Sequence, residues 1–272
     1  MKIGSVATPF LPFGEVRYQK MKSFGFDAVD LNLSDTDSPF YTEDAIVWKE
    51  QQLLKAADIE VSQLHGPWRW PTEDSTQEAR AERMDKMRRS IDIAAMMKCP
   101  YVVVHPLMPY GVHEKKNGQP DETEKINVEF MSRLTEYAQK MQVTLCLENL
   151  PFPLFSFGTP EETLHLIHTI DHQNCKMCLD TGHINFYHTP KLNIADQVRR
   201  AANEIRCLHV HDNHGLVDSH LMPRFGKIDW QAFVSALREI NYQGIFSLET
   251  KVPRTLPLPL LEDACRLLAH IT

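Results

Sequence analysis

Eight short apolar runs recur along the chain at nearly even intervals, and this spacing constrains the fold more than any single motif does. Each run is almost entirely apolar, as the strands of a parallel sheet buried on both faces must be. Between the runs, apolar residues recur three and four positions apart, which is the pattern of amphipathic helices. The runs lie at residues 3–6, 28–33, 61–64, 101–104, 143–147, 176–179, 205–210 and 244–248.

The alternation of strand and helix predicts right-handed crossovers, which leaves an open doubly wound sheet or a closed (β/α)8 barrel. Eight units in 272 residues fit the barrel. An open sheet would be expected to carry a phosphate-binding turn, and the sequence contains neither G-x-G-x-x-G nor a P-loop. We therefore predict an α/β chain with a single (β/α)8 TIM barrel domain over residues 1–272. Thr42, Ser75 and Thr159 are the expected N-caps of three helices.

The net charge of −7 gives the chain no general attraction for nucleic acid or an anionic membrane. The basic stretch at residues 80–89 contains Glu82 and Asp85 and is expected to be a solvated helix face. No apolar run approaches the ~18 residues of a membrane helix, and the first residues read as a strand rather than a signal peptide. We expect a cytoplasmic protein with a small-molecule partner, without nucleic acid or membrane, and compatible with a homo-oligomer.

The six cysteines are scattered and lack the spacing of a disulfide framework. Most of them lie within or beside apolar runs, so free buried thiols are expected. Cys175 and Cys178 have the spacing of a redox or zinc motif. The sequence has no second pair, and Cys178 lies inside an apolar run, so core packing is the favoured interpretation.

Seven of the apolar runs end in or beside a polar side chain, and six of these seven side chains are preferred ligands of divalent cations. In a (β/α)8 barrel the carboxyl ends of the strands carry the chemistry, so we expect these side chains to converge. Carboxylates gathered this closely repel one another, and a bound cation removes that repulsion. The pattern therefore predicts a divalent metal site. The seven are Asn32, His65, His105, Glu148, Asp180, His209 and Glu249.

Each of the stronger candidates has a structural alternative. Glu148 and Glu249 follow apolar runs, which favours a ligand or catalytic base over a partner in a salt bridge. Asp180 is favoured as a ligand over a helix N-cap, and His183, across a glycine turn, can face the same cavity or simply face water. Alternation sends His209 and His211 to one side of the strand. We assign His209 as a ligand and His211 to substrate or to the groups that support the ligands.

The weaker candidates lie at strand ends and in loops. His65 and His105 each stand alone and are either ligands or structural histidines, and Asp218 and His220 have ligand spacing within a loop. Trp68 and Trp70 are equally consistent with packing and with a wall over a ligand. Arg69, Arg224 and Lys227 are candidate anion contacts or solvated cations; of these we assign Arg224, together with Trp68, to substrate binding.

Four motifs occur in order along the chain: Glu148-Asn149, Asp180-Thr181-Gly182-His183, His209-Val210-His211-Asp212-Asn213 and Glu249. Together they resemble the xylose isomerase-like TIM barrels. That superfamily includes sugar phosphate isomerases and epimerases and the apurinic endonucleases of the endonuclease IV type. The resemblance covers essentially the whole chain.

Resemblance to the ketose 3-epimerase branch implies one Mn²⁺-like ion held by four residues. They would be Glu148, Asp180, His209 and Glu249, with the two glutamates as the proton-transferring pair and His183 on a substrate oxygen. Leu154 and Gly215 stand where that branch carries Glu and Arg, so the chain departs from it at these two positions.

Resemblance to the endonuclease IV branch implies three zinc ions and nine ligands, all of whose residue types occur here in order. The loop at residues 34–38 lacks an Arg that would probe DNA, and its two Asp would repel phosphate. The segment 225–230 resembles the Gly-x-Gly-x-Ile-Asp-Trp turn of the isomerase-like group, with Lys227 at the second Gly. The nine are His65, His105, Glu148, Asp180, His183, His209, Asp218, His220 and Glu249.

These observations predict a metal-dependent isomerase or epimerase of a sugar or polyol, phosphorylated or not. Glu148 and Glu249 would transfer a proton next to a metal-polarised carbonyl. The cofactor would be one to three divalent ions, because the histidines suit Zn²⁺ and the carboxylates suit Mn²⁺. The alternatives are a zinc-dependent apurinic-site endonuclease and a metal-stabilised binding barrel without turnover.

Overall fold

A computed structural model describes residues 1–35, 37–68, 74–186, 191–253 and 256–270. Its eight strands pair in parallel in the order β7-β6-β5-β4-β3-β2-β1-β8. Every expected run forms a strand whose ends differ by at most two residues from the expected ones. The strands are β1 Ile3–Val6, β2 Ala28–Asn32, β3 Glu60–His65, β4 Tyr101–Val104, β5 Thr144–Glu148, β6 Cys175–Asp180, β7 Ile205–His209 and β8 Phe246–Leu248.

The sheet closes on itself just beyond the end of β7. Val210 pairs in parallel with Leu248 of β8. The Val210 N–H donates to the Ser247 carbonyl at 2.9 Å, and the Glu249 N–H donates to the Val210 carbonyl at 3.0 Å. These bonds join the two edge strands, and the predicted (β/α)8 barrel is confirmed over the open doubly wound sheet. The closure lies at the carboxyl end of the strands and so ties Glu249 to the residues that follow β7.

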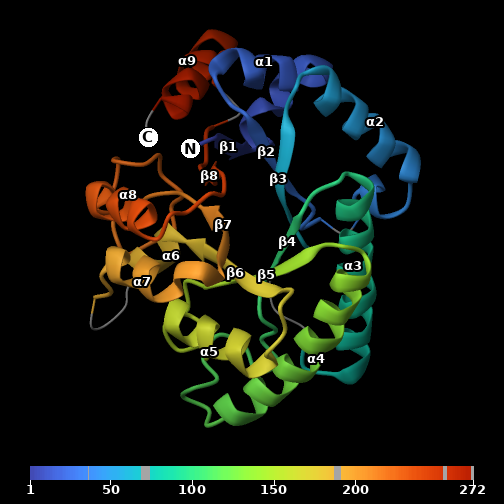
Figure 1. Cartoon of the computed structure of the whole chain (residues 1–272), viewed down its shortest axis with the longest axis vertical. Coiled ribbons are helices and arrows are strands. Elements are labelled where there is room, and N and C mark those ends of the chain that lie inside the picture. Colours follow the sequence, from blue (N-terminus) through green and yellow to red (C-terminus); the bar gives the residue numbers. More distant parts are fainter. Residues whose placement is uncertain (36, 69–73, 187–190, 254–255, 271–272) are drawn as a thin grey trace.

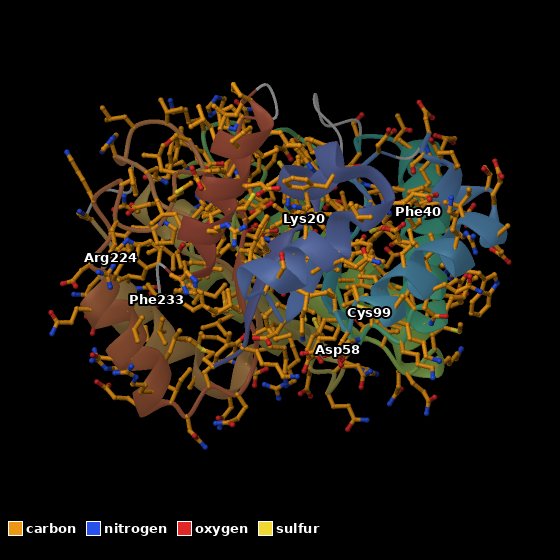
Figure 2. The ribbon with its side chains drawn as sticks, turned by 90° about the horizontal axis from the view of Figure 1, so that it is seen from above. Lys20, Phe40, Asp58, Cys99, Arg224 and Phe233 are labelled. Carbon is orange, nitrogen blue, oxygen red and sulfur yellow. The ribbon has the colours of Figure 1, made fainter. Side chains whose placement is uncertain are left out.

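Helices surround the strands in the order in which they follow them (Figure 1). Helices α1 and α9, from opposite ends of the chain, lie together, and Figure 2 shows Lys20 on α1. Lys20 forms an ion pair with Glu262 of α9 at 2.7 Å. The helices are η1 Thr8–Val16, α1 Arg17–Phe24, η2 Pro39–Tyr41, α2 Asp44–Ala56, α3 Gln77–Met96, α4 Pro120–Lys140, α5 Pro160–Ile170, α6 Thr181–Asn185, α7 Ile194–Ala201, η3 Ala202–Glu204, α8 Trp230–Glu239 and α9 Leu258–Ala269.

Of the three residues expected to be helix N-caps, the structure confirms one. Thr159 caps α5 in a full capping box, in which its side chain accepts from the Glu162 N–H and the Glu162 side chain accepts from the Thr159 N–H. For α3 the expected cap, Ser75, is wrong by one residue, because the Thr76 hydroxyl accepts from the Ala79 N–H. Thr42 is not a cap either, since α2 begins after Glu43 without a side-chain cap bond.

The cysteines are free and buried, as expected. Cys146, Cys178 and Cys207 pack with Val103 in a small cluster across β4 to β7, so the core interpretation of Cys178 is confirmed. The basic stretch is not entirely solvated: Arg83 is buried, donates to the Pro67 carbonyl at 3.1 Å and faces Asp74. None of the helices in the described ranges is long and apolar enough to cross a membrane.

Candidate metal centre

The carboxyl ends of six strands bring nine acids and imidazoles into one connected group. Four of the nine are the last residues of their strands, and three of these are His65 of β3, Glu148 of β5 and Asp180 of β6. His209 ends β7, and the others follow a strand closely or lie in the loop after β7. Asn32 ends β2 but stays exposed, and its side chain accepts from the Ser34 N–H instead. The group contains His65, His105, Glu148, Asp180, His183, His209, Asp218, His220 and Glu249.

Glu148 lies at the middle of this group and is almost fully buried. Its Oε2 is 3.1 Å from His105 Nε2 and 3.4 Å from His65 Nε2. Its Oε1 is 3.1 Å from His209 Nδ1, and that same nitrogen lies 3.5 Å from Glu249 Oε2. A buried carboxylate with imidazoles on both oxygens is a charged site rather than a packing position.

The second part of the group lies around Asp180 and Asp218. Asp180 Oδ2 is 3.0 Å from His211 Nε2, and its Oδ1 accepts from the His183 N–H at 2.7 Å. Asp180 therefore caps the short helix α6 with one oxygen and faces the histidines with the other. Asp218 Oδ2 lies 3.0 Å from His220 Nε2 and 3.5 Å from His183 Nε2, which joins the loop after β7 to α6.

Backbone carbonyls orient three of the imidazoles. The Nδ1 atoms of His65, His183 and His220 lie 2.8, 2.7 and 2.8 Å from the carbonyls of Gly66, Asn149 and Glu249. A carbonyl can only accept, so each Nδ1 carries the hydrogen. When the ring is neutral, its lone pair therefore lies on Nε2, which faces a carboxylate of the group. The same arrangement is typical of histidines that bind metals.

Asp30 of β2 performs this role for His209, and sequence reasoning missed it. Its Oδ2 is 3.2 Å from His209 Nε2 and accepts from Gln63 Nε2 at 2.8 Å. Burial alone would lower the pKa of His209, but Glu249, Glu148 and Asp30 outweigh burial and raise that pKa well above its usual value. In the neutral ring, Asp30 favours the proton on Nε2, which leaves the Nδ1 lone pair facing Glu148 and Glu249. A lone Asp within an apolar run was the signal in the sequence.

Asn149 and Gly182 belong to the sequence motifs, and the structure shows which contacts require each of them. Asn149 Oδ1 accepts from the Asp180 N–H at 2.9 Å, and its Nδ2 donates to the Asp180 carbonyl at 3.1 Å. A Cβ on Gly182 would lie 1.9 Å from His211 Cε1. The glycine is therefore required where the His211 ring packs against α6.

Asp212 organises the loop that carries Asp218 and His220. Its carboxylate is fully buried, and it accepts from the N–H groups of Asn213, Arg224, Lys227 and Ile228 and from Trp230 Nε1. A Cβ on Gly226 would lie 2.2 Å from Asp212 Oδ1. The turn at residues 225–230 therefore wraps around the Asp212 carboxylate. This contact explains why the turn contains Gly226 and Trp230.

The ionisation of these groups is coupled. Burial alone would raise the pKa of the Glu148 carboxyl, but His209 and His105 outweigh burial and hold that pKa well below its usual range. Asp180 follows the same rule, with His183 and His211 lowering its pKa against burial. Burial lowers the pKa of His183, but Asp180, Asp218 and Glu148 outweigh it and raise that pKa to about 10. Without an ion, protons on the imidazoles balance the carboxylates.

The residues present fit a divalent cation. His209 Nδ1 is buried and makes no hydrogen bond within the ranges that the structure describes, although two carboxylates lie beside it. One candidate oxygen or nitrogen from each of Glu148, Asp180, His209 and Glu249 lies within 4.8 Å of the others. Further groups of ligand atoms at this spacing are His65-Glu148-His209, Asp180-His183-His211 and His211-Asp218-His220.

A cavity of about 440 Å³ opens onto this group, a volume typical of small-molecule sites. Trp68 lines it, whereas His211 is buried behind it against Asp180. Arg224 and Lys227 are exposed and do not line it; Arg224 lies toward the periphery of the molecule (Figure 2). Arg69 and Trp70 lie outside the described residues.

Comparison with known proteins agrees with this geometry. The family model described as xylose isomerase-like TIM barrel matches residues 18–271. D-psicose 3-epimerase of Enterocloster bolteae is 23% identical over 242 residues, which cover 85% of this chain and 74% of that relative. The chain therefore belongs to the xylose isomerase-like TIM barrel family, whose curated relatives here include sugar epimerases and isomerases.

Two solved structures show how closely the fold agrees. A D-tagatose 3-epimerase-like protein superposes with a TM-score of 0.79 at 24% identity, covering 100% of this chain and 98% of the other. The IolI protein with a bound zinc atom superposes with a TM-score of 0.77 at 20% identity, covering 100% and 96%. At these identities the structures establish a shared fold.

Proposed function

We propose that this family member is a metal-dependent isomerase or epimerase of a sugar or polyol, which transfers a proton next to a carbonyl. One observation carries the proposal: Glu148 and Glu249 flank His209 Nδ1 at 3.1 and 3.5 Å, with Asp180 in the same cluster. Two carboxylates at one cation site supply both a base and an acid. Membership of a family with sugar epimerases supports this reading.

The proton transfer is assigned to this chain's own carboxylates. Glu148 takes the proton from the carbon next to the substrate carbonyl, and the electron pair of that C–H bond becomes the double bond of an enediolate. Glu249, which must begin this step protonated, then gives its proton to the opposite face of the carbon while the electron pair on oxygen re-forms the carbonyl, which inverts the centre. Proton exchange with water returns Glu148 and Glu249 to their starting forms. A divalent cation held by Glu148, Asp180, His209 and Glu249 would supply Lewis-acid stabilisation of the charge on the substrate oxygens.

Three further residues are assigned to the substrate or to the support of a ligand. His183 is anchored by the Asn149 carbonyl and lines the cavity, so we assign it to a substrate oxygen. Trp68 packs on His105 with ring centroids 5.6 Å apart and provides a flat wall beside the site. His211, buried against Asp180, is assigned to support that ligand rather than to contact substrate.

The experiment that tests the proposal compares three purified, metal-loaded proteins. Glu148→Gln and Glu249→Gln should each lower the rate of epimerisation at least a thousandfold. Removing a positioned acid or base typically lowers the rate by about 10² to 10⁴, and each change also weakens binding of the metal ion. Glu161→Gln, an exposed glutamate on α5, is the control and should keep full activity. Full activity in either site variant would contradict the assignment.

Identity and number of the ions are tested by metal analysis of protein purified without added metal or chelator. We propose one to three divalent ions per chain. The bound zinc of the IolI structure favours Zn²⁺, and the four-residue set with three carboxylates suits Mn²⁺. Protein that is active after exhaustive chelation would overturn the cofactor proposal.

A second candidate function rests on the full set of nine side chains. Two or three close ions are suited to phosphodiester cleavage, because they can stabilise both attacking and leaving oxygens. If zinc-loaded protein cuts a DNA duplex at an abasic site, apurinic-site endonuclease becomes the first of the two proposed activities. The net charge of −7 opposes binding to DNA, and we rank this activity second. The single-domain extent, the cytoplasmic location and a homo-oligomer remain predictions.

A further inference from the structure

The cavity at the metal centre has two chemically different parts. One part is formed by the carboxylates and imidazoles described above. The other is apolar and is contributed by the loops that follow five successive strands, β3 to β7. Five separate loops contribute to it, so this apolar part is an extended surface and not a single exposed side chain. Its members include Trp68, Met108, Phe152, Phe186, Leu216 and Val217.

Leu216 and Val217 are the most exposed members of this wall, at 72% and 67%. The base of their loop is fixed: Asn213 Oδ1 accepts from the Gly215 N–H at 2.8 Å, and Asn185 Nδ2 donates to the Asn213 carbonyl at 3.0 Å. Gly215 has a φ of +86°, which favours glycine and allows the chain to turn there. The turn therefore presents two large apolar side chains to solvent at the rim, directly before Asp218.

The charge among the described lining residues of the cavity disfavours phosphorylated substrates. Among the described residues that line it, the charged side chains besides histidine are Glu148, Asp218 and Glu249, and no Lys or Arg is present. A phosphate placed against the apolar wall would lose its hydration without gaining a cationic partner, and burying an unpaired charge is strongly unfavourable. Asp218, which is outside the four-residue cation set and directly follows Val217, would also repel the dianion. An apolar group placed there would instead release water from the wall.

We propose that the substrate is an unphosphorylated sugar derivative that carries an apolar group, such as an aromatic or alkyl aglycone, on the side remote from the reacting carbons. The reacting carbons lie at the metal centre and the apolar group lies against Trp68, Leu216 and Val217. This inference rests on the proposed function, which places the reacting carbons, and goes beyond it by naming the remote part of the substrate.

The test uses three forms of one keto sugar that differ only at the remote position, where they carry a hydroxyl, a phosphate ester or a phenyl ether. Metal-loaded protein is incubated with each in heavy water, and exchange of the proton next to the carbonyl is followed by NMR. We expect the KM of the phenyl form to be roughly tenfold below that of the hydroxyl form. The KM of the phosphate form should be at least tenfold above it.

Binding is measured separately by calorimetry with the three corresponding alcohols, which lack the carbonyl and cannot react. This separates the two ideas. If no form exchanges its proton, the proposed function fails, but the order of affinities still decides the substrate class. Tightest binding by the phosphate form, or equal binding by the phenyl and hydroxyl forms, would overturn the inference whatever the turnover.

Two variants connect the preference to the wall. Leu216→Ser and Val217→Ser are exposed changes that should leave the fold intact, and each should raise the KM of the phenyl form several-fold more than that of the hydroxyl form. Leu260→Ser, at a similarly exposed leucine of α9, is the control and should change neither. A change of oligomeric state in the rim variants, with the phenyl KM unaltered, would show that the wall packs against another copy and would refute the proposal.

Discussion

At the scale of single residues, the centre depends on which nitrogen of each imidazole carries the hydrogen. Carbonyl groups decide this for His65, His183 and His220, and a buried carboxylate does so for His209. Asp30 is therefore as much a part of the site as the residues that would hold an ion, although it contacts the Nε2 atom of His209 and they contact the Nδ1 atom. Supporting groups of this kind typically change metal affinity 10- to 100-fold.

Asp30→Asn tests this role. The amide keeps the shape but loses the charge that holds the proton on His209 Nε2, so the dissociation constant of the bound ion should rise about 10- to 100-fold. Competition against a chromogenic chelator measures it directly. Asp58→Asn changes an exposed carboxylate of the opposite surface and should leave the constant unaltered. Equal affinities in the Asp30 variant and the parent protein would remove Asp30 from the site.

The ionisation of His183 predicts how metal binding depends on pH. Its pKa is raised to about 10 in the metal-free protein, against an ordinary value of 6.5, so at pH 7 the ring is protonated. A divalent ion held by Asp180 and Glu148 would offset the negative charge that keeps this ring protonated, so ion binding should release that proton. Affinity should therefore rise with pH up to about 10 and fall as pH is lowered. Calorimetry in two buffers of different ionisation enthalpy should detect the released protons; a pH-independent affinity would contradict the shift.

At the scale of elements, one glycine couples a helix to a strand. Gly182 lies in α6, and His211 follows β7; an added Cβ would sit 1.9 Å from the His211 ring. The ring cannot move without leaving Asp180, whose second oxygen caps the same helix. A single substitution in the turn should therefore disturb both the packing and the ligand set.

Gly182→Ala is expected to lower the free energy of unfolding by about 1–3 kcal/mol through overpacking and to weaken metal binding at the same time. Gly118→Ala is the matched control: its φ of +69° costs backbone strain of roughly 1 kcal/mol, but no atom lies within 4 Å of the new Cβ. Urea unfolding and chelator competition on both variants separate strain from damage to the site. Normal metal affinity in the Gly182 variant would show that His211 tolerates displacement.

At the scale of the whole molecule, the barrel brings together side chains from six strands, so an ion bound among them links most of the fold. An ion that binds only the folded chain stabilises it by about 2.7 kcal/mol when its concentration is a hundred times the dissociation constant. Chelation should therefore lower the Tm by several degrees, and added Zn²⁺ or Mn²⁺ should restore it. Identical melting curves with and without chelator would mean that no ion is shared by these strands.

The order of strands and the types of side chain at their ends could be predicted from the sequence, because both follow from local periodicity and from the right-handedness of βα crossovers. Thr159 was recognisable as a cap, whereas Thr76 was not distinguished from Ser75, since adjacent hydroxyl residues differ only in backbone conformation. Arg83 was wrongly placed on a solvated face, because a charge inside a basic stretch reveals its buried partner only when the chain has folded.

The sequence by itself determined that His65, Glu148, Asp180, His209 and Glu249 would lie at one end of a closed barrel. Tertiary structure alone decided that Asp30 lies behind His209, that carbonyl groups orient three imidazoles, and that five loops place an apolar wall beside three carboxylates. The physical reason is the separation along the chain of the residues that set each feature. Periodicity is written in neighbouring residues, whereas the partner of a buried nitrogen is set by the distance between strands far apart in the chain.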